Sequence, residues 1–255
     1  MTPELIRETP AEGVLLLSLN RPEKRNALAT PLLVAIANAL DEADRDDHIR
    51  AIVLSGNDKV FAAGADLDEL AQSTGADTIE NPRFLAWARI RACAKPMIAA
   101  VEGWCLGAGL ELILRTDLVI AGSGARFGQP ETNLGIMPGA GGTSILPRLV
   151  GRSLAMEMVL TGEPISADRA LSAGLVARVV PDATALKSAL ELASKLASRA
   201  PRALRKAKAS IIEAEDLALR DHLLGERVAF VGLLSSPEKE EGIAAFRERR
   251  SPHWQ

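Results

Sequence analysis

The sequence predicts an α/β fold that continues into a helical C-terminal part. Up to about residue 180, short apolar runs of strand length alternate with longer segments of helical spacing. The strand-like runs are apolar throughout, which is typical of parallel strands covered by helices on both faces. From residue 184 onward only helical patterns follow. Because no linker-like change of composition separates the two parts, we expect one domain with a helical extension.

Local patterns define each element in turn. Thr30 and Pro31 are typical of an N-cap and a first helical position. The segment 125–151 is rich in Gly and Pro and is too long to be a simple connector. Strands are predicted over 12–20, 49–56, 97–103, 117–122 and 176–181. Helices are predicted over 31–46, 82–94, 110–116, 153–162, 166–174, 184–200, 202–232 and 238–250.

The composition restricts the classes of partner. The 255 residues are 47% hydrophobic and 25% charged, with a net charge of -3, which is ordinary for a soluble globular protein. This balance gives no global attraction to nucleic acid. No apolar run reaches the roughly 18 residues of a membrane span, and the first residues lack the apolar centre of a secretory signal. We expect no nucleic-acid partner, no membrane insertion and a cytoplasmic location.

Several common catalytic motifs are incomplete in this chain. The run GAGLEL has Leu112 where a dinucleotide fingerprint needs Gly, and GAGGTS has no Lys before Thr143, as a P-loop would need. The three histidines are far apart, and Cys93 and Cys105 do not have zinc-ligand spacing. We therefore expect no metal site, and the cysteines fit a reducing compartment. Because Tyr is absent, acid catalysis must come from carboxylates, His, Lys or Cys.

The stretch FAAGADLDEL has two interpretations. Asp66 followed by Glu69 is a capping-box pattern, so the stretch can simply be a well-capped helix start. The alternative is functional, because Ala63, Gly64 and Ala65 leave the backbone open to a ligand. Amides at a helix start are free donors for an oxyanion or a phosphate.

The stretch GWCLGAGLELIL repeats this arrangement of small residues before a helix. Two such loops can bring two amide donors together, as the developing charge of a thioester enolate requires. For Glu111 the residues leave two possibilities open. Glu111 and Arg115 are four apart and can form an exposed salt bridge. Alternatively, Gly107 and Ala108 leave space beside a half-buried catalytic carboxylate.

A third acid, Glu131, lies in the run FGQPE at the start of a Gly- and Pro-rich loop. Taken alone it is most simply a solvated acid in a turn, because most acids are exposed. The loop is nevertheless low in charge and contains Leu134, Ile136 and Met137. That composition predicts a buried functional loop.

These motifs together resemble the enoyl-CoA hydratase (crotonase) family, and among its members most closely an enoyl-CoA hydratase. The resemblance is carried by FAAGAD, AAVEGWCLGAGLEL, FGQPE, LGIMPGAGGT and LVGRSLAMEMVLTGEPISADRALSAGLVARVV, in that order. It extends from LNRPEKRNAL to PEKEEGIAAFRERRSP. It implies a crotonase-like spiral of ββα turns over 1–195. It also implies a C-terminal helical region over 196–255 that builds homotrimers, commonly paired into homohexamers.

The resemblance also implies a site for acyl-CoA thioesters. Ala65 and Ala108 match the two amides of the oxyanion hole. Glu111 matches the base that activates water, and Glu131 the acid that protonates the α carbon. Coenzyme A would be part of the substrate, and no other cofactor is expected. Positions matching acyl-CoA contacts are Arg25, Ala63, Ala65, Asp66, Leu67, Trp87, Gly107, Ala108, Pro138 and Gly139.

Alternatives remain at several of these points. Trp87 fits a core tryptophan as well as a substrate contact, and Arg25 fits an exposed basic side chain. The segment 71–81 carries no signature, so the acyl chain is not defined. Both acids favour a hydratase of fatty-acid or aromatic or branched acyl-CoA catabolism over isomerases that lack one or both of them. Carnitinyl-type dehydratases also retain acids at such positions, so this alternative stays open. A basic run over 199–210 is the one support for an RNA-binding or non-catalytic member, and it lacks interleaved aromatics.

Overall fold

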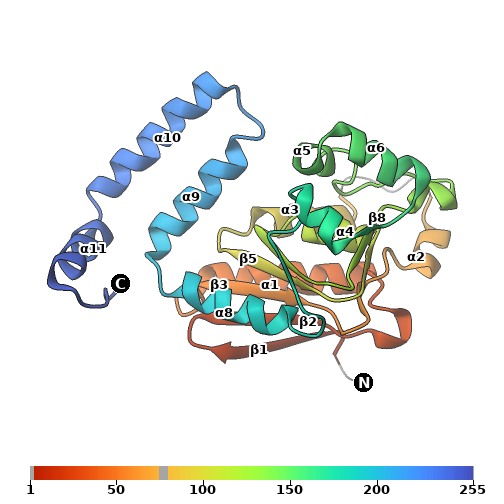
Figure 1. Cartoon of the computed structure of the whole chain (residues 1–255), viewed down its shortest axis with the longest axis horizontal. Helices are drawn as coiled ribbons and strands as arrows, with labels where there is room; N and C mark the ends of the chain where they lie inside the picture. Colours follow the sequence, from red (N-terminus) through yellow and green to blue (C-terminus); the bar gives the residue numbers. More distant parts are fainter. Residues whose placement is uncertain (1–2, 75–79, 255) are drawn as a thin grey trace.

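The computed structural model describes residues 3–74 and 80–254, and has an α/β core from which a group of C-terminal helices extends (Figure 1). All five predicted strands and the predicted helices are present, with ends shifted by a few residues. The strands are β1 (Leu5–Ala11), β2 (Val14–Leu19), β3 (Ala51–Ser55), β4 (Val60–Ala62), β5 (Met97–Val101), β6 (Trp104–Leu106), β7 (Leu118–Gly122), β8 (Arg126–Gly128), β9 (Ile165–Ser166) and β10 (Arg178–Val180).

The helices connect these strands and then form the C-terminal part. The α-helices are α1 (Thr30–Arg45), α2 (Leu67–Gln72), α3 (Pro82–Ala92), α4 (Ala108–Ile113), α5 (Leu146–Val150), α6 (Arg152–Thr161), α7 (Ala167–Ser172), α8 (Ala185–Ala197), α9 (Pro201–Glu213), α10 (Leu219–Leu234) and α11 (Pro237–Glu248). Two short 3-10 helices are η1 (Pro22–Lys24) and η2 (Glu131–Leu134).

The larger sheet has the order β1-β2-β3-β5-β7-β10, and all its pairs except β1–β2 are parallel. Successive residues of its strands face opposite sides. Leu54 belongs to a core with α1 and α3, whereas its neighbour Val53 packs against α8. The stripe of alanines on α8 at every fourth position lets this helix lie close to the sheet. The prediction of parallel strands covered on both faces is therefore confirmed.

A smaller sheet was not predicted from the sequence. Its strands are two or three residues long and have the order β4-β6-β8-β9. Each of β4, β6 and β8 follows a long strand of the larger sheet, so the chain repeats a unit of long strand, short strand and helix. This repeat is the ββα spiral that the resemblance implied. The sharp step between β5 and β6 needs Gly103, because a side chain there would meet the carbonyl of Lys59.

One helix start differs from the prediction. The N-cap of α1 is Ala29, and Thr30 is already helical, so the prediction of Thr30 as N-cap is wrong. The physical reason is an acid from another element. The Thr30 amide donates to Glu69 Oε2 at 2.7 Å, and the Thr30 hydroxyl donates to the same carboxylate. Asp66 is the N-cap of α2, as predicted, and accepts from the amides of Asp68 and Glu69.

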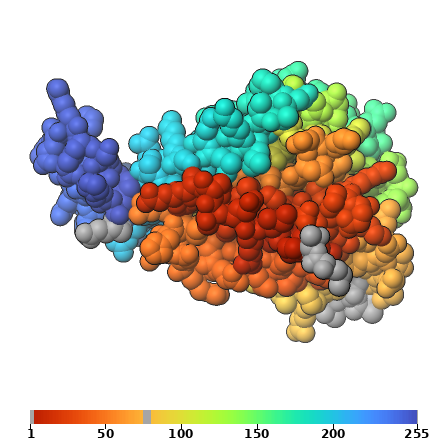
Figure 2. Space-filling model, turned by 90° about the horizontal axis from the view of Figure 1, so that it is seen from below, coloured from red at the N-terminus to blue at the C-terminus, as the bar shows by residue number. Residues whose placement is uncertain are grey.

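The C-terminal helices α9, α10 and α11 extend from one end of the core (Figures 1 and 2). The predicted helical segment 202–232 is interrupted at 214–218, where the chain turns from α9 into α10. Part of the basic run 199–210 faces inward, because Lys208 Nζ lies 2.9 Å from Asp117 Oδ2 and donates to the Lys95 carbonyl. Over the described residues, none of the helices has the length and apolar character needed to cross a bilayer.

Candidate active site

Two Gly-rich loops lie side by side at the ends of β4 and β6, which pair in parallel. Gly64 and Gly107 have φ angles of 126° and 50°, which favour glycine. The loops approach closely, since a side chain on Gly107 would place its Cβ 3.5 Å from Gly64 Cα. Over the described part of the chain, neither the Ala65 nor the Ala108 amide donates a hydrogen bond to another residue. Both amides are therefore available to an acceptor in the space between the loops.

Glu111 lies in the first turn of α4 and is only 3% exposed. Its Oε1 accepts hydrogen bonds from the amides of Ala140 at 2.5 Å and Gly142 at 3.0 Å. Among the described residues no ion pair joins Glu111 to Arg115. Arg115 Nη2 donates instead to the Ala140 carbonyl at 2.7 Å. The exposed salt bridge that the spacing allowed is therefore not formed, and Glu111 is a buried acid.

Glu131 begins the short helix η2 and is half-buried. Its Oε1 lies against Gly107, 2.9 Å from the position that a Cβ would take there. Burial, together with the nearby charge of Glu111, raises the pKa of Glu131 to about 7. With its amide nitrogen turned toward the acid, Gln129 donates to both carboxylate oxygens at 2.9 Å. The simple interpretation of Glu131 as a solvated turn acid is therefore wrong.

The loop after β4, which contains Ala63, Gly64 and Ala65, lines a cleft of about 460 Å³ together with Glu131. Six of the predicted substrate-binding positions line it. Gly107 is one of these six, and Ala108 is the next residue in the chain. These six are Arg25, Ala63, Ala65, Asp66, Leu67 and Gly107. Asp66 is largely buried and its carboxylate lies 3.0 Å from Arg21 Nη2, so this acid supports the loop.

Four predicted substrate contacts, and the predicted base Glu111, do not line this cleft. Ala108 is 4% exposed and follows Gly107 at the start of α4. Trp87 is 5% exposed and packs in the main hydrophobic core, so its burial supports the interpretation as a core tryptophan. Pro138 is buried against Gly142, and Gly139 is an exposed residue of the loop before Ala140. Among the described residues lining the cleft, Lys24, Ala27, Leu70 and Pro130 were not predicted. Their types are common on any surface, so no pattern in the sequence marks them as site residues.

The loop after Glu131 departs from the prediction in one respect. Leu134, Ile136 and Met137 were expected to be buried, yet all three are exposed, and Met137 is exposed by 63%. Two of them, Leu134 and Ile136, line the cleft, so their apolar side chains face space that is open to a ligand. The loop also contributes to the site through backbone groups, because it supplies both amides that hold Glu111. Segment 71–81, which the resemblance assigns to the acyl pocket, includes residues 75–79, which lie outside the described residues.

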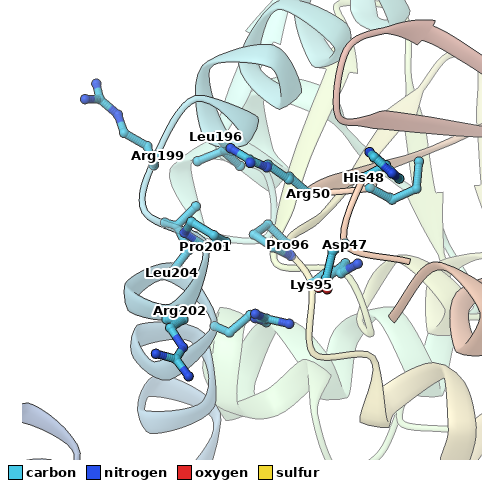
Figure 3. A pocket seen from close by; sticks show the side chains of 12 residues that line it. Asp47, His48, Arg50, Lys95, Pro96, Leu196, Arg199, Pro201, Arg202 and Leu204 are labelled. Carbon is cyan, nitrogen blue, oxygen red and sulfur yellow. The ribbon is translucent and has the colours of Figure 1, made fainter. Parts of the chain in front are cut away.

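A second cavity, of about 490 Å³, is lined by basic residues at the junction of α8 and α9 (Figure 3). Lys95 is buried there and donates to the carbonyls of Ala43 and Asp46. The side chains of Arg199 and Arg202 point away from the group formed by Arg50, Lys95 and Pro96 (Figure 3). The cationic side chains of this cavity therefore do not converge on one point. The cavity is not lined by Asp66, Glu111 or Glu131, the three acids predicted as functional. Over the described residues, no group of His, Cys, Asp and Glu side chains could hold a metal ion.

Comparisons with known proteins show the family of the chain and its fold. A family model described as enoyl-CoA hydratase/isomerase matches residues 9–255. A 2,3-dehydroadipyl-CoA hydratase of Escherichia coli (strain K12) is 50% identical over 241 residues, covering 94% of each chain. A crystal structure of an enoyl-CoA hydratase subunit I from Geobacillus kaustophilus HTA426 has a TM-score of 0.94 at 40% identity, covering 99% of this chain and 98% of that one. An enoyl-CoA hydratase structure from Bacillus anthracis has a TM-score of 0.90 at 37% identity and covers 99% of both.

The fold is therefore that of the crotonase class, an α/β spiral with a C-terminal helical region. The chain belongs to the enoyl-CoA hydratase/isomerase family. The family resemblance and the fold class predicted from the sequence are both confirmed.

Proposed function

We propose that the protein adds water across the 2,3 double bond of a 2-enoyl-CoA thioester to give a 3-hydroxyacyl-CoA. The single observation that carries this proposal is that two acids in different surroundings lie near two backbone amides that have no hydrogen-bond partner among the described residues. Glu131 faces the cleft beside Gly107, and Glu111 lies one helical turn further along α4. Hydration of an enoyl thioester needs a base for water, an acid for the α carbon and donors for the thioester oxygen.

The two amides act on the charge that builds up during the reaction. As the oxygen of water bonds to the β carbon, the electrons of the double bond move toward the thioester carbonyl, and negative charge develops on its oxygen. The amides of Ala65 and Ala108 donate to that oxygen. Preorganised donors of this kind are worth about 3–4 kcal/mol each in the transition state. No metal or redox cofactor is needed for this chemistry, because the charge is met by backbone dipoles.

The two acids then move the two protons. Glu111 holds its Oε1 against two amides, which leaves Oε2 to accept a proton from water. Glu131 has a pKa of about 7, so near neutral pH a large fraction is protonated and can donate to the α carbon. One proton leaves water and one enters the α carbon, so the product differs from the substrate by one water molecule. The charge of Glu111 is one cause of the raised pKa of Glu131, after burial.

A hydration assay tests this proposal directly. The purified protein is expected to consume crotonyl-CoA or a longer 2-enoyl-CoA, measured as loss of absorbance of the conjugated thioester. Glu131→Gln is expected to remove most of that activity. Full activity in both Glu111→Gln and Glu131→Gln would overturn the assignment. An assay with a 3-enoyl-CoA separates hydration from double-bond isomerisation.

For the acyl chain, we propose a six-carbon substrate with a terminal carboxylate. The support is the 50% identity to a relative described as a 2,3-dehydroadipyl-CoA hydratase. A matched pair of substrates tests it, namely 2,3-dehydroadipyl-CoA and 2-hexenoyl-CoA, which differ in that carboxylate. A higher kcat/KM for the diacid is expected. Equal values, or a preference for hexenoyl-CoA, would refute this choice and leave hydration itself intact.

For coenzyme A, we propose that Arg25 contacts the phosphates at the mouth of the cleft. Arg25 lines the cleft on the turn after η1, and Lys24 beside it is paired with Asp68 at 2.7 Å. Arg25→Gln is expected to raise KM with little change in kcat, because a phosphate contact is made equally in substrate and transition state. An unchanged KM would remove Arg25 from the binding site.

We further propose that the protein is a homotrimer or a homohexamer and that it is cytoplasmic. The helices α9 to α11 carry many exposed large apolar side chains, more than is usual on a monomer surface. These include Ile211, Leu219, Leu224, Val228, Phe230 and Phe246. Light scattering coupled to gel filtration is expected to give three or six times the chain mass of 27.1 kDa. The free cysteines Cys93 and Cys105 support a reducing compartment.

A further inference from the structure

The loop that holds Glu111 depends on an arginine that the proposed mechanism does not use. Between Ile136 and Ser144 the chain forms no helix or strand. At the centre of this described stretch two side chains bind the backbone. Glu111 accepts from the amides of Ala140 and Gly142, and Arg115 donates to the Ala140 carbonyl. Toward α5, the Gly141 carbonyl accepts from the amides of Ile145 and Leu146. Glu111 and Arg115 therefore tie the centre of the loop to α4 and the turn after it, while α5 holds its far end.

The contacts fall on three successive peptide groups. The amide of Ala140 and the amide of Gly142 both donate to Glu111 Oε1. The peptide between them carries the Ala140 carbonyl, which accepts from Arg115 Nη2 at 2.7 Å. Gly141 has a φ of 127°, and a Cβ on it would lie 3.5 Å from Arg115 Nη2. Arg115 thus holds the middle peptide of the three while Glu111 holds the outer two.

Arg115 and Glu111 come from the same short segment of chain. They are four residues apart, with Glu111 in the first turn of α4 and Arg115 just after its end. The result is a closed ring of contacts from Glu111 through Ala140 to Arg115 and back along the helix. An i, i+4 pair of opposite charges would ordinarily meet directly. Here the loop backbone lies between them.

The surroundings of Arg115 argue against a role in stability alone. Burial and the nearby Arg91 lower the pKa of Arg115, so its charge is held in an unfavourable place. Its Nε is buried and has no hydrogen-bond partner among the described residues. A leucine or methionine would fill this position without those costs. The charge-assisted bond to the Ala140 carbonyl is the compensating feature.

We propose that Arg115 is a positioning residue for the catalytic acid Glu111, acting through the Ala140–Gly142 loop. This rests on the proposed function, in which Glu111 takes the proton from water. If the middle peptide is released, the two amides no longer fix the direction of the carboxylate. A displacement of about 1 Å in a reacting group can cost up to about a hundredfold in rate.

The test compares Arg115→Met, Arg115→Lys and a control, Arg126→Met. Arg126 also donates to loop carbonyls, those of Gly124 and Ala125, but it holds neither acid. With an enoyl-CoA that the wild type hydrates, kcat of Arg115→Met is expected to fall about tenfold, with KM within about twofold. Arg115→Lys keeps one cationic donor and is expected to have an intermediate kcat. Arg126→Met is expected to retain the wild-type kcat.

Hydrogen exchange measured by mass spectrometry gives a second readout that does not need turnover. The proposal is supported if exchange over 135–145 is faster in Arg115→Met than in the wild type. Exchange there should be intermediate in Arg115→Lys and unchanged in Arg126→Met. The proposal is overturned if kcat of Arg115→Met is unchanged or if Arg115→Lys loses as much activity as Arg115→Met. It is also overturned if Arg115→Met exchanges over 135–145 at the wild-type rate. If Arg115→Met does not fold, Arg115→Lys provides the test: faster exchange over 135–145 than in the wild type supports the proposal, and wild-type exchange overturns it. If the wild type hydrates no enoyl-CoA, the proposed function fails, while the exchange result still shows whether Arg115 holds the loop.

Discussion

The surroundings of the two acids differ, and the difference supports the roles proposed for them. Glu111 is buried on a helix and bound by two backbone amides, so its direction is fixed. Glu131 is half-buried on a short 3-10 helix and faces the cleft, and burial raises its pKa to about 7. A fixed acceptor suits a base that aligns water, and a neutral carboxyl suits a proton donor. In the proposed mechanism one type of side chain therefore supplies two functions, because the surroundings of each copy differ.

Removal of either carboxylate is expected to have the largest effect on the rate of hydration. Glu111→Gln and Glu131→Gln each keep the shape of the side chain but lose the proton-transfer group. We expect kcat to fall by about 10²–10⁴ in each, since a positioned acid or base contributes that much. Steady-state hydration kinetics measure both. The double variant is expected to lose less than the product of the two factors, because the acids act in one step. Independent, multiplicative losses would contradict the shared step.

A smaller change moves Glu131 without removing it. In Gly107→Ala the new methyl group would lie 2.9 Å from Glu131 Oε1, at a φ of 50° that disfavours alanine. We expect kcat to fall by roughly ten- to a hundredfold, because the acid is displaced from the α carbon. The matched control is Gly225→Ala on α10, where a Cβ meets no other atom within 4 Å. There we expect unchanged kcat and a melting temperature equal to or above that of the wild type.

Much of this site could be predicted from the sequence, and particular residues show where prediction stops. Glu111, Glu131 and the two small-residue loops are contiguous motifs, so they are visible as patterns. The amides of Ala140 and Gly142 are not, because any residue carries an amide and the contact is made across 29 to 31 positions. The short strands of the second sheet have too few residues to show a period. Trp87 was undecidable, since a core tryptophan and a substrate contact have the same local pattern.

The acidity of Glu131 predicts how the rate depends on pH. Its pKa is raised from 4.5 to about 7, and hydration uses the protonated form. We therefore expect kcat for hydration to fall as the pH rises through about 7, approaching tenfold per pH unit above it. For dehydration of the 3-hydroxyacyl-CoA, Glu131 must be ionised, so that rate is expected to rise over the same range. Rates measured in both directions between pH 5.5 and 8.5 check the sign.

The same pKa predicts a change in stability. Between about pH 4.5 and 7 the folded protein holds a proton on Glu131 that the unfolded chain has released. The free energy of unfolding is therefore expected to fall as the pH rises through this window. Urea unfolding of wild type and Glu131→Gln isolates the contribution, because the amide does not titrate. An identical pH dependence in the two proteins would contradict a pKa near 7.

The smallest effect is expected at Gln129, which is fully buried and donates to both oxygens of Glu131 at 2.9 Å. These donors stabilise the ionised carboxylate, so their loss in Gln129→Met is expected to raise the pKa of Glu131 further. The falling limb of the hydration rate should then move to higher pH by less than about one unit, with a smaller effect on its maximum. A shift to lower pH would mean that Gln129 turns its carbonyl to the acid. The carbonyl would then accept a hydrogen bond from the protonated carboxyl and add to the effects of burial and of Glu111.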